Sequence, residues 1–359
     1  MNTQDIRTDR VVRATALVFL FTLLTIILKS LAFLFIPLII SLLCCYVLGF
    51  PLDLLKRLRI PGWLRIVIVI FLALIVIYLL GTLVEANVRQ FQERFPEFEK
   101  RFWEYAGKVF ELLNITPEQA KSTFSAFVRN IQGEDLKPIG TMVQWMGGSF
   151  FSILGNIIGV LLYMVFMLPE REVLPRRILA AMGEEKSVPV LDSVSGINKA
   201  VRHYLGLKTL ISLMTGALVS LMLWALGVPF ALLWGVLAFV LNFIPNIGSL
   251  LAAVPPIAVA LFHFGSFGKT LIVAGGFAII QVVMGSYLEP KLMGKGLNLS
   301  PLCVLLALVF WGWLWGITGM LLSVPLTAAL RIAMEQLEPT RPLAVLMSDL
   351  PAQSIEKTS

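Results

Sequence analysis

The chain consists of long apolar runs separated by short polar stretches. A straight α-helix needs about 20 apolar residues to cross the roughly 30 Å hydrocarbon layer of a membrane. Several runs approach or reach that length, and we expect each to form one membrane-spanning helix. These runs cover residues 11–28, 31–50, 66–84, 147–168, 207–227 and 270–288.

Two further apolar stretches, 229–262 and 300–335, are too long for one straight span, while each half is short for a full crossing. Proline and glycine interrupt both, so we expect kinked spans, pairs of short helices or re-entrant hairpins. The predicted fold is all-α, a polytopic helical membrane protein with about six to eight crossings. The interrupting residues are Pro245, Pro255 and Pro256, then Gly312, Gly316, Gly319 and Pro325.

Composition agrees with this prediction. Hydrophobic residues make up 58% of the 359 residues and charged residues 14%, against roughly 25% charged in soluble domains. The net charge of +7 comes from cations gathered at the ends of spans, which indicates a lipid bilayer as partner and not nucleic acid. Cys44, Cys45 and Cys303 lie inside apolar runs, so we expect neither a disulfide framework nor a zinc site.

The basic residues also predict an orientation. They precede the first span and follow the second and fourth, and cytoplasmic loops carry such an excess of lysine and arginine. We therefore expect both termini in the cytoplasm, the N-terminal run kept as a first span, and residues 85–145 outside. The basic residues are Arg7, Arg10 and Arg13; Lys56, Arg57, Arg59 and Arg65; and Arg171, Arg176, Arg177, Lys186, Lys199 and Arg202.

The segment 85–145 contains apolar residues at alternating spacings of three and four, which predict one apolar side on a helix. A second helix is expected to begin at Thr116, followed by Pro117 at its first position. This apolar side, which we call the aromatic seam, either packs against that second helix or meets the same seam in a neighbouring subunit. Pro96 predicts a kink within the seam. Its aromatic residues include Phe91, Phe95, Phe98 and Phe102.

A short internal repeat relates two parts of the C-terminal half. Residues 208–211 (KTLI) recur at 269–272, and 248–255 resemble 319–325. Copies that begin on opposite faces of the membrane would form an inverted repeat, an arrangement found in many secondary transporters. We therefore divide the chain into 1–84, with three transmembrane helices; 85–145, the external helical insertion; 146–206, a transmembrane helix and a basic cytoplasmic segment; 207–335, a core with repeats 207–262 and 269–335; and a cytoplasmic tail, 336–359.

Polar groups in the C-terminal half gather where the apolar stretches break. Pro245 lacks a backbone donor and leaves carbonyls without partners, while neighbouring amides and hydroxyls can bind a solute. An interruption at membrane depth must be buried in protein or line a watery cavity, so we predict a translocation pathway here; the alternative is a kink whose amides only cap helix ends. The predicted pathway residues are Asn242, Pro245, Asn246, Gly248, Ser249, Gln281, Asn298 and Ser300.

Charge is scarce in this half of the chain. Glu289, beside Pro290 and Lys291, is the main acidic group and has either a coupling or gating role or forms an ion pair with Lys291 or Lys295. The sequence contains no HExxH, GxSxG or Walker A motif, and we predict no enzyme, metal site or cofactor. Gly155 and Gly159 belong to a small-residue face that predicts helix packing.

Several motifs resemble the signature of the autoinducer-2 exporter family of bacterial membrane proteins, the AI-2E-type transporters. They are residues 242–248 (NFIPNIG), 252–256 (AAVPP), 289–294 (EPKLMG), 299–301, 311–312, 319–326 and the ending 344–350. Within the family, the chain looks most similar to members that export the quorum-sensing signal autoinducer-2. The resemblance implies a multi-pass protein of the bacterial inner membrane and a homo-oligomer, with a pentamer as one option. It also implies export of a small, neutral, furanose-like polyol.

Three functions remain open at this point. The first is export of autoinducer-2 or a similar small polar metabolite through the broken segments. The second is a sodium (cation)/proton antiporter that uses Glu289, because the family has also been linked to such exchange. The third is a structural or receptor-like membrane oligomer whose external helices bind a partner. Family membership alone does not decide the cargo.

Overall fold

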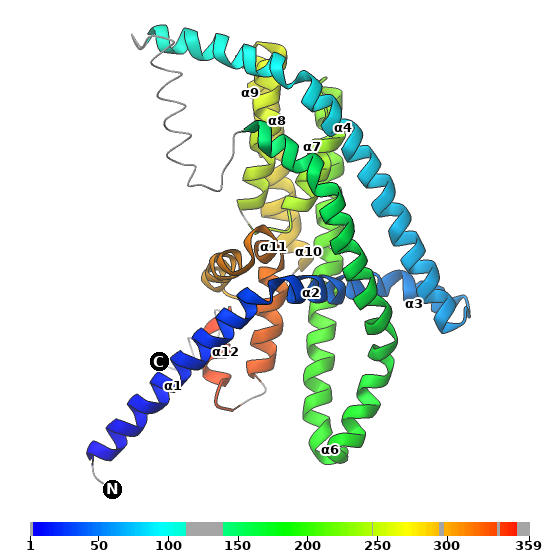
Figure 1. Cartoon of the computed structure of the whole chain (residues 1–359), viewed down its shortest axis with the longest axis vertical. Coiled ribbons are helices and arrows are strands. Elements are labelled where there is room, and N and C mark those ends of the chain that lie inside the picture. The colour runs from blue at the N-terminus through cyan, green and yellow to red at the C-terminus, as the bar shows by residue number, and fades with distance from the viewer. Residues whose placement is uncertain (1–2, 113–138, 246, 294–297, 336–337, 350–359) are drawn as a thin grey trace. The chain divides into compact units, whose positions relative to one another are not determined.

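A computed structural model describes residues 3–112, 139–245, 247–293, 298–335 and 338–349, most of which are helical, with no strand among them. This confirms the predicted all-α class. The helices are α1 (Thr3–Ser30), α2 (Ala32–Val47), α3 (Gly49–Arg57), α4 (Gly62–Leu112), α6 (Ile139–Ala225), α7 (Ala231–Leu241), α8 (Ile247–Phe264), α9 (Phe267–Gln281), the π-helix η1 (Val282–Leu288), α10 (Glu289–Met293), α11 (Pro301–Glu335) and α12 (Arg341–Met347) (Figure 1).

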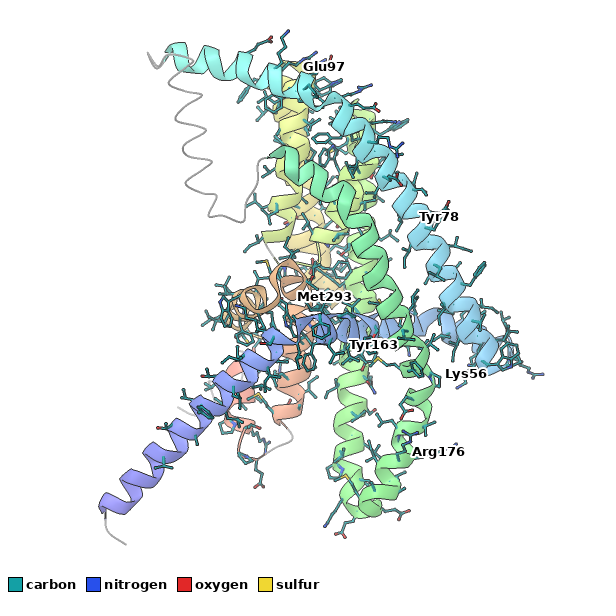
Figure 2. All side chains as sticks on the ribbon, viewed as in Figure 1. Lys56, Tyr78, Glu97, Tyr163, Arg176 and Met293 are labelled. Atoms are coloured by element: carbon teal, nitrogen blue, oxygen red, sulfur yellow. The ribbon has the colours of Figure 1, made fainter. Side chains whose placement is uncertain are left out.

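Within the described residues, 5 helices are long and apolar enough to cross a membrane. A sixth candidate is the pair Val18–Ser30 and Ala32–Val47, which bends by 83° and brings the number to the lower end of the predicted range. The apolar part of α4 is the clearest case, because only 6% of its most apolar window is buried in protein. Tyr78 on this helix is 69% exposed and points outward from the ribbon (Figure 2), as expected of a helix facing lipid.

The chain divides into two compact units. The first unit comprises residues 1–50, 158–206 and 295–359, and the second comprises 51–157 and 207–294. The first unit has a small core of Leu314, Trp315 and Leu322, against which apolar residues of α1 and α2 pack. The indole Nε1 of Trp315 donates a hydrogen bond to the carbonyl of Leu28 at 3.0 Å, which ties α11 to α1.

Glycine shapes the central part of the first unit. The long helix α6 turns back at Gly183, whose φ of 74° is disfavoured for residues with a side chain (Figure 1). A Cβ on Gly159 would lie 3.9 Å from Cβ of Pro37 on α2, so this predicted packing glycine does lie at a helix contact. Gly155 lies on α6 in the second unit, and its surroundings lie outside what the structure describes.

The predicted interruption of 300–335 occurs at one place. Trp315 and Gly316 have non-helical dihedrals, with φ of 63° at Gly316, whereas Gly312, Gly319 and Pro325 lie in the helical arms of α11. A Cβ on Gly319 would lie only 1.8 Å from the carbonyl oxygen of Trp311. The chain therefore folds back at Gly316, and the two arms of α11 touch backbone to backbone.

In the second unit, α7 ends at Leu241 and residues 242–245 are not helical, as expected for the Pro245 region. The predicted breaks at Pro255 and Pro256 are wrong, because α8 runs without interruption from Ile247 to Phe264. Proline is tolerated inside membrane helices, where neighbouring groups satisfy the backbone carbonyls that it leaves without a donor. A Cβ on Gly248 would lie 1.8 Å from the carbonyl oxygen of Leu241, so α7 and α8 also meet backbone to backbone.

Gly248 and Gly319 are the glycines that the sequence repeat aligns, and a Cβ added to either would lie 1.8 Å from a carbonyl oxygen. The two copies of the sequence repeat therefore share one feature, a close contact between a glycine and a carbonyl oxygen of the preceding helical segment. Whether the two copies cross the membrane in opposite senses stays a prediction.

The aromatic seam has a partner that the sequence did not indicate. Val88 and Phe98 are buried in the core of the second unit. The ring of Phe91 meets those of Phe230 and Trp234 edge to face, with centroids 5.5 and 6.1 Å apart. Phe91 therefore has a partner at the beginning of α7 in the same chain, and contact of the seam with a second helix of the insertion or with another subunit stays a prediction.

The rest of the insertion is described only in part. The helix α4 continues through Pro96 to Leu112, and it changes direction near Glu97 (Figure 2), in agreement with the predicted kink. The side chains of Phe95 and Phe102, and the helix expected to begin at Thr116, lie outside the described residues.

Candidate functional site

The second unit contains a cavity of about 340 Å³ among α6, α7, α8 and α9. Its walls are mainly apolar, with alanine, valine, leucine, isoleucine and phenylalanine side chains. The polar lining residues carry uncharged hydroxyls or amides, namely Thr215, Asn242, Ser249 and Gln281. The cavity therefore joins three of the predicted pathway residues, Asn242, Ser249 and Gln281, and adds Thr215.

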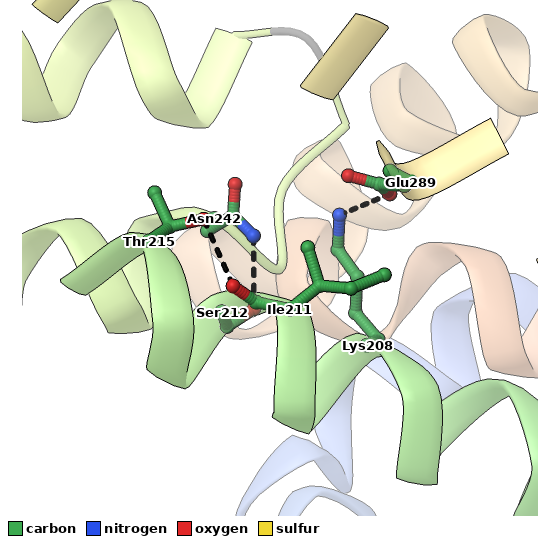
Figure 3. Close-up of polar contacts among 6 residues, drawn as sticks. All are labelled: Lys208, Ile211, Ser212, Thr215, Asn242 and Glu289. Atoms are coloured by element: carbon green, nitrogen blue, oxygen red, sulfur yellow. Dashed lines mark hydrogen bonds and ion pairs between the residues drawn. The ribbon is translucent and has the colours of Figure 1, made fainter. Parts of the chain in front are cut away.

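Asn242 is held in place at the C-terminal end of α7. Its side chain is 8% exposed, and its amide nitrogen donates a hydrogen bond to Oγ of Ser212 at 2.9 Å. One turn further along α6, Thr215 Oγ1 donates to the carbonyl of Ile211 at 2.8 Å (Figure 3). Because these bonds fix both side chains, the cavity presents a preorganised polar edge.

Gln281 is the last residue of α9, where the α-helix widens into the π-helix η1. π-Helical turns are rare in proteins, but those that do occur are often found at functional sites. Pro290 explains the change locally, since it lacks the amide that an α-helix would pair with the carbonyl of Ser286. The side-chain amide of Gln281 makes no hydrogen bond with any residue that the structure describes.

Lys208, on the same face of α6 as Ser212 and Thr215, forms an ion pair with Glu289. Nζ of Lys208 is 2.5 Å from Oε1 of Glu289, and the two side chains are 4% and 23% exposed (Figure 3). The predicted pairing of Glu289 with Lys291 is therefore wrong, because Lys291 lies over the ring of Tyr287 at 5.4 Å instead. Lys295 lies outside the described residues.

The ion pair and the cavity share one stripe of α6. Lys208, Ser212 and Thr215 follow each other at spacings of four and three, which places them on one helix face. The predicted site residues did not include Ser212, Thr215 or Lys208, although polar residues at helical spacing in an apolar run are a visible signal. No group of three potential metal ligands occurs among the described residues.

The remaining predicted residues lie elsewhere or serve packing. Gly248 allows the contact with Leu241, and Pro245 accepts a hydrogen bond from the amide of Ile247 at 2.6 Å. Asn246 lies outside the described residues. Asn298 and Ser300 belong to the first unit, where Ser300 Oγ accepts from the amide of Cys303 at the beginning of α11. Both also bond the end of α12 through their backbones, so their observed contacts are structural.

Comparison with known proteins identifies the family. A model described as AI-2E family transporter matches residues 15–338, which is most of the chain. The chain belongs to the AI-2E transporter family. Members of this family are transporters, and the membrane-length helices of the chain agree with a multi-pass membrane protein.

Individual AI-2E relatives differ in how much of the chain they match. "AI-2 transport protein TqsA" of Escherichia coli K12 is 49% identical over 197 residues, so the match spans about half of each protein, 55% of this chain and 56% of the relative. A "Putative transport protein" of Haemophilus influenzae is 34% identical over 88% of this chain and 90% of its own length. "Putative transport protein YhhT" of Escherichia coli K12 is 35% identical over 79% of this chain and 78% of its own length.

Proposed function

We propose that this AI-2E family protein exports autoinducer-2, or a small polar metabolite like it, across the bacterial inner membrane, and that the cavity of the second unit binds the solute. The observation that carries this proposal is the lining of the cavity, where amides and hydroxyls of Thr215, Asn242, Ser249 and Gln281 stand among apolar walls. Such groups bind hydroxyls without placing a charge in a region of low dielectric constant.

The size of the cavity supports a small solute. Ligand pockets typically measure roughly 300–1,000 Å³ and combine apolar walls with a few placed polar groups. At about 340 Å³ the cavity lies at the small end of that range. The 49% identity with the AI-2 transport protein TqsA favours autoinducer-2 over other neutral metabolites of that size.

The test is flux of labelled autoinducer-2 through proteoliposomes that contain the purified chain. Asn242→Ala should slow the flux several-fold, because it removes both the fixed amide and the partner of Ser212. Asn87→Ala is a matched control, since Asn87 lies on α4 and donates only to the carbonyl of Leu83 in its own helix. Flux no faster than in empty vesicles contradicts the proposal, and so does an Asn242→Ala variant that behaves like the control.

One observation favours a second function, sodium (cation)/proton antiport. Ionisable residues inside membrane segments usually have a functional role, and the Lys208–Glu289 pair is largely buried. On this hypothesis a cation or a proton competes with Lys208 for the Glu289 carboxylate. Glu289→Gln should abolish cation-driven proton movement in vesicles loaded with a pH indicator, and unchanged movement rejects antiport through this residue.

We also propose that the protein forms a homo-oligomer. In each subunit, both termini lie in the cytoplasm. The basic residues at the ends of the predicted spans support this orientation, as the positive-inside rule requires. Thiol labelling of single cysteines placed in the tail at Ser359 and in the insertion at Glu97 tests the orientation in intact cells. A tail that reacts with an impermeant reagent from outside contradicts it.

A further inference from the structure

Gly285 lies one turn beyond Gln281, inside the π-helix η1. A Cβ on Gly285 would lie 2.7 Å from Nε2 of Gln281 and 3.3 Å from its Cδ. The side chain of Gln281 therefore folds back across Gly285, and its amide occupies the space that a methyl group would fill. Neither the family motifs nor the sequence patterns single out Gly285.

The contact at Gly285 differs from those at Gly248 and Gly319. At Gly248 and Gly319 an added methyl group would meet backbone carbonyls, which cannot move without disrupting the helices. At Gly285 it would meet only the far end of one flexible side chain. A methyl group at Gly285 should thus leave the fold in place and displace the Gln281 amide.

The two cavity amides are held in different ways. Asn242 is fixed by its bond to Ser212, whereas Gln281 has no such bond among the described residues and is held by shape alone. The half-buried Gln281 amide stands among mainly apolar walls, and a hydroxyl of a bound solute would supply the hydrogen bond that it lacks there. Both the donor and the acceptor of the Gln281 side chain are therefore available to a solute.

We propose that Gly285 is a positioning residue that seats the Gln281 amide at the cavity, where this amide recognises a hydroxyl of the transported solute. The inference rests on the proposed function and deepens it, because it assigns solute recognition to a side chain at the α9–η1 junction. It requires a neutral solute with hydroxyl groups, since one uncharged amide both donates to and accepts from hydroxyls.

The experiment measures labelled autoinducer-2 flux against concentration in proteoliposomes. Gly285→Ala should raise the half-saturating concentration about 3- to 10-fold, as expected for one lost neutral hydrogen bond, with the maximum rate unchanged. Gly275→Ala is the matched control, because Gly275 lies on α9 with nothing within 4 Å of its added Cβ. This control should transport like the unmodified chain.

A double-mutant cycle separates positioning from general damage. Gln281→Ala should raise the half-saturating concentration by a similar factor, and adding Gly285→Ala should change it no further, since no amide remains to be displaced. A structural role alone would lower the maximum rate or the yield of protein and would act in both backgrounds.

The outcomes distinguish this inference from the proposed function. If the unmodified chain transports autoinducer-2 and Gly285→Ala keeps the half-saturating concentration of Gly275→Ala, the positioning role is refuted and the proposed function stands. Independent effects of the two substitutions also refute it. If the unmodified chain moves no more autoinducer-2 than empty vesicles do, the proposed function fails and the inference fails with it.

Discussion

The Lys208–Glu289 ion pair predicts an unequal response to the loss of each partner. Removing one member of a buried pair typically costs about 3–5 kcal/mol, because the other charge stays buried without compensation. Lys208 is 4% exposed and Glu289 is 23% exposed. Glu289→Gln should therefore destabilise the fold by about 3 kcal/mol, while Lys208→Met, which leaves the partly hydrated carboxylate, should cost about half as much.

The assay is reversible unfolding of the purified chain by SDS in mixed micelles, with tryptophan fluorescence as the signal. In the double variant Lys208→Met/Glu289→Gln no charge remains unpaired, so its loss of stability should be smaller than the sum of the two single losses by about 2 kcal/mol. Glu85→Gln serves as the control. Its partner Arg89 is 71% exposed and Glu85 is 52% exposed, and such surface pairs contribute about 0.5 kcal/mol or less.

Two results would refute this reasoning. Losses that add within about 0.5 kcal/mol would mean that the two charges do not interact in the folded protein. A larger loss for Lys208→Met than for Glu289→Gln would mean that Lys208 is the better solvated partner, contrary to the burial in the structure.

Further substitutions test the packing. Gly248→Ala and Gly319→Ala should each prevent folding or cost more than about 3 kcal/mol, because the methyl group would lie 1.8 Å from a backbone oxygen; Gly275→Ala should be nearly neutral in the same unfolding assay. Phe91→Ala should cost about 3 kcal/mol, since it removes two edge-to-face contacts with Phe230 and Trp234; an unfolding midpoint equal to that of the unmodified chain would exclude this packing. Arg101→Ala should cost about 1–2 kcal/mol, because Nη1 of Arg101 donates to the last carbonyls of α8 at 2.8 and 2.9 Å; hydrogen exchange near Phe264 should rise, and unchanged exchange would contradict the role.

The sequence predicted the membrane-spanning character and the break between α7 and α8 because both depend on local information. Runs of apolar residues fix where helices can cross a bilayer, and Pro245 lies in the break itself. At Pro255 and Pro256 the same local signal was misleading, because the surroundings of the helix decide whether a proline breaks it.

The contacts that build the site were harder to predict because they join distant segments. Lys208 and Glu289 are 81 positions apart, whereas the prediction pairs Glu289 with a neighbouring lysine. Helix geometry argues against Lys291, since residues two apart do not face each other. Similarly, the spacing of the aromatic seam indicated that one side was buried, but not that Phe230 and Trp234 of α7 would cover Phe91.

The close contacts of α7 also restrict how the cavity can change shape. Besides the Gly248–Leu241 contact, a Cβ on Gly235 would lie 1.7 Å from Oγ of Ser220 and 2.6 Å from the carbonyl oxygen of Gly216. A helical hairpin with no space between its backbones cannot bend at its tip and must move as a rigid body. The contact of Gly235 with α6 holds the hairpin across Gly227 as well, so the free pivot is at its other end, where Gly265 has a φ of 60°. A solute that opens or closes this cavity would turn α9 relative to the hairpin about Gly265.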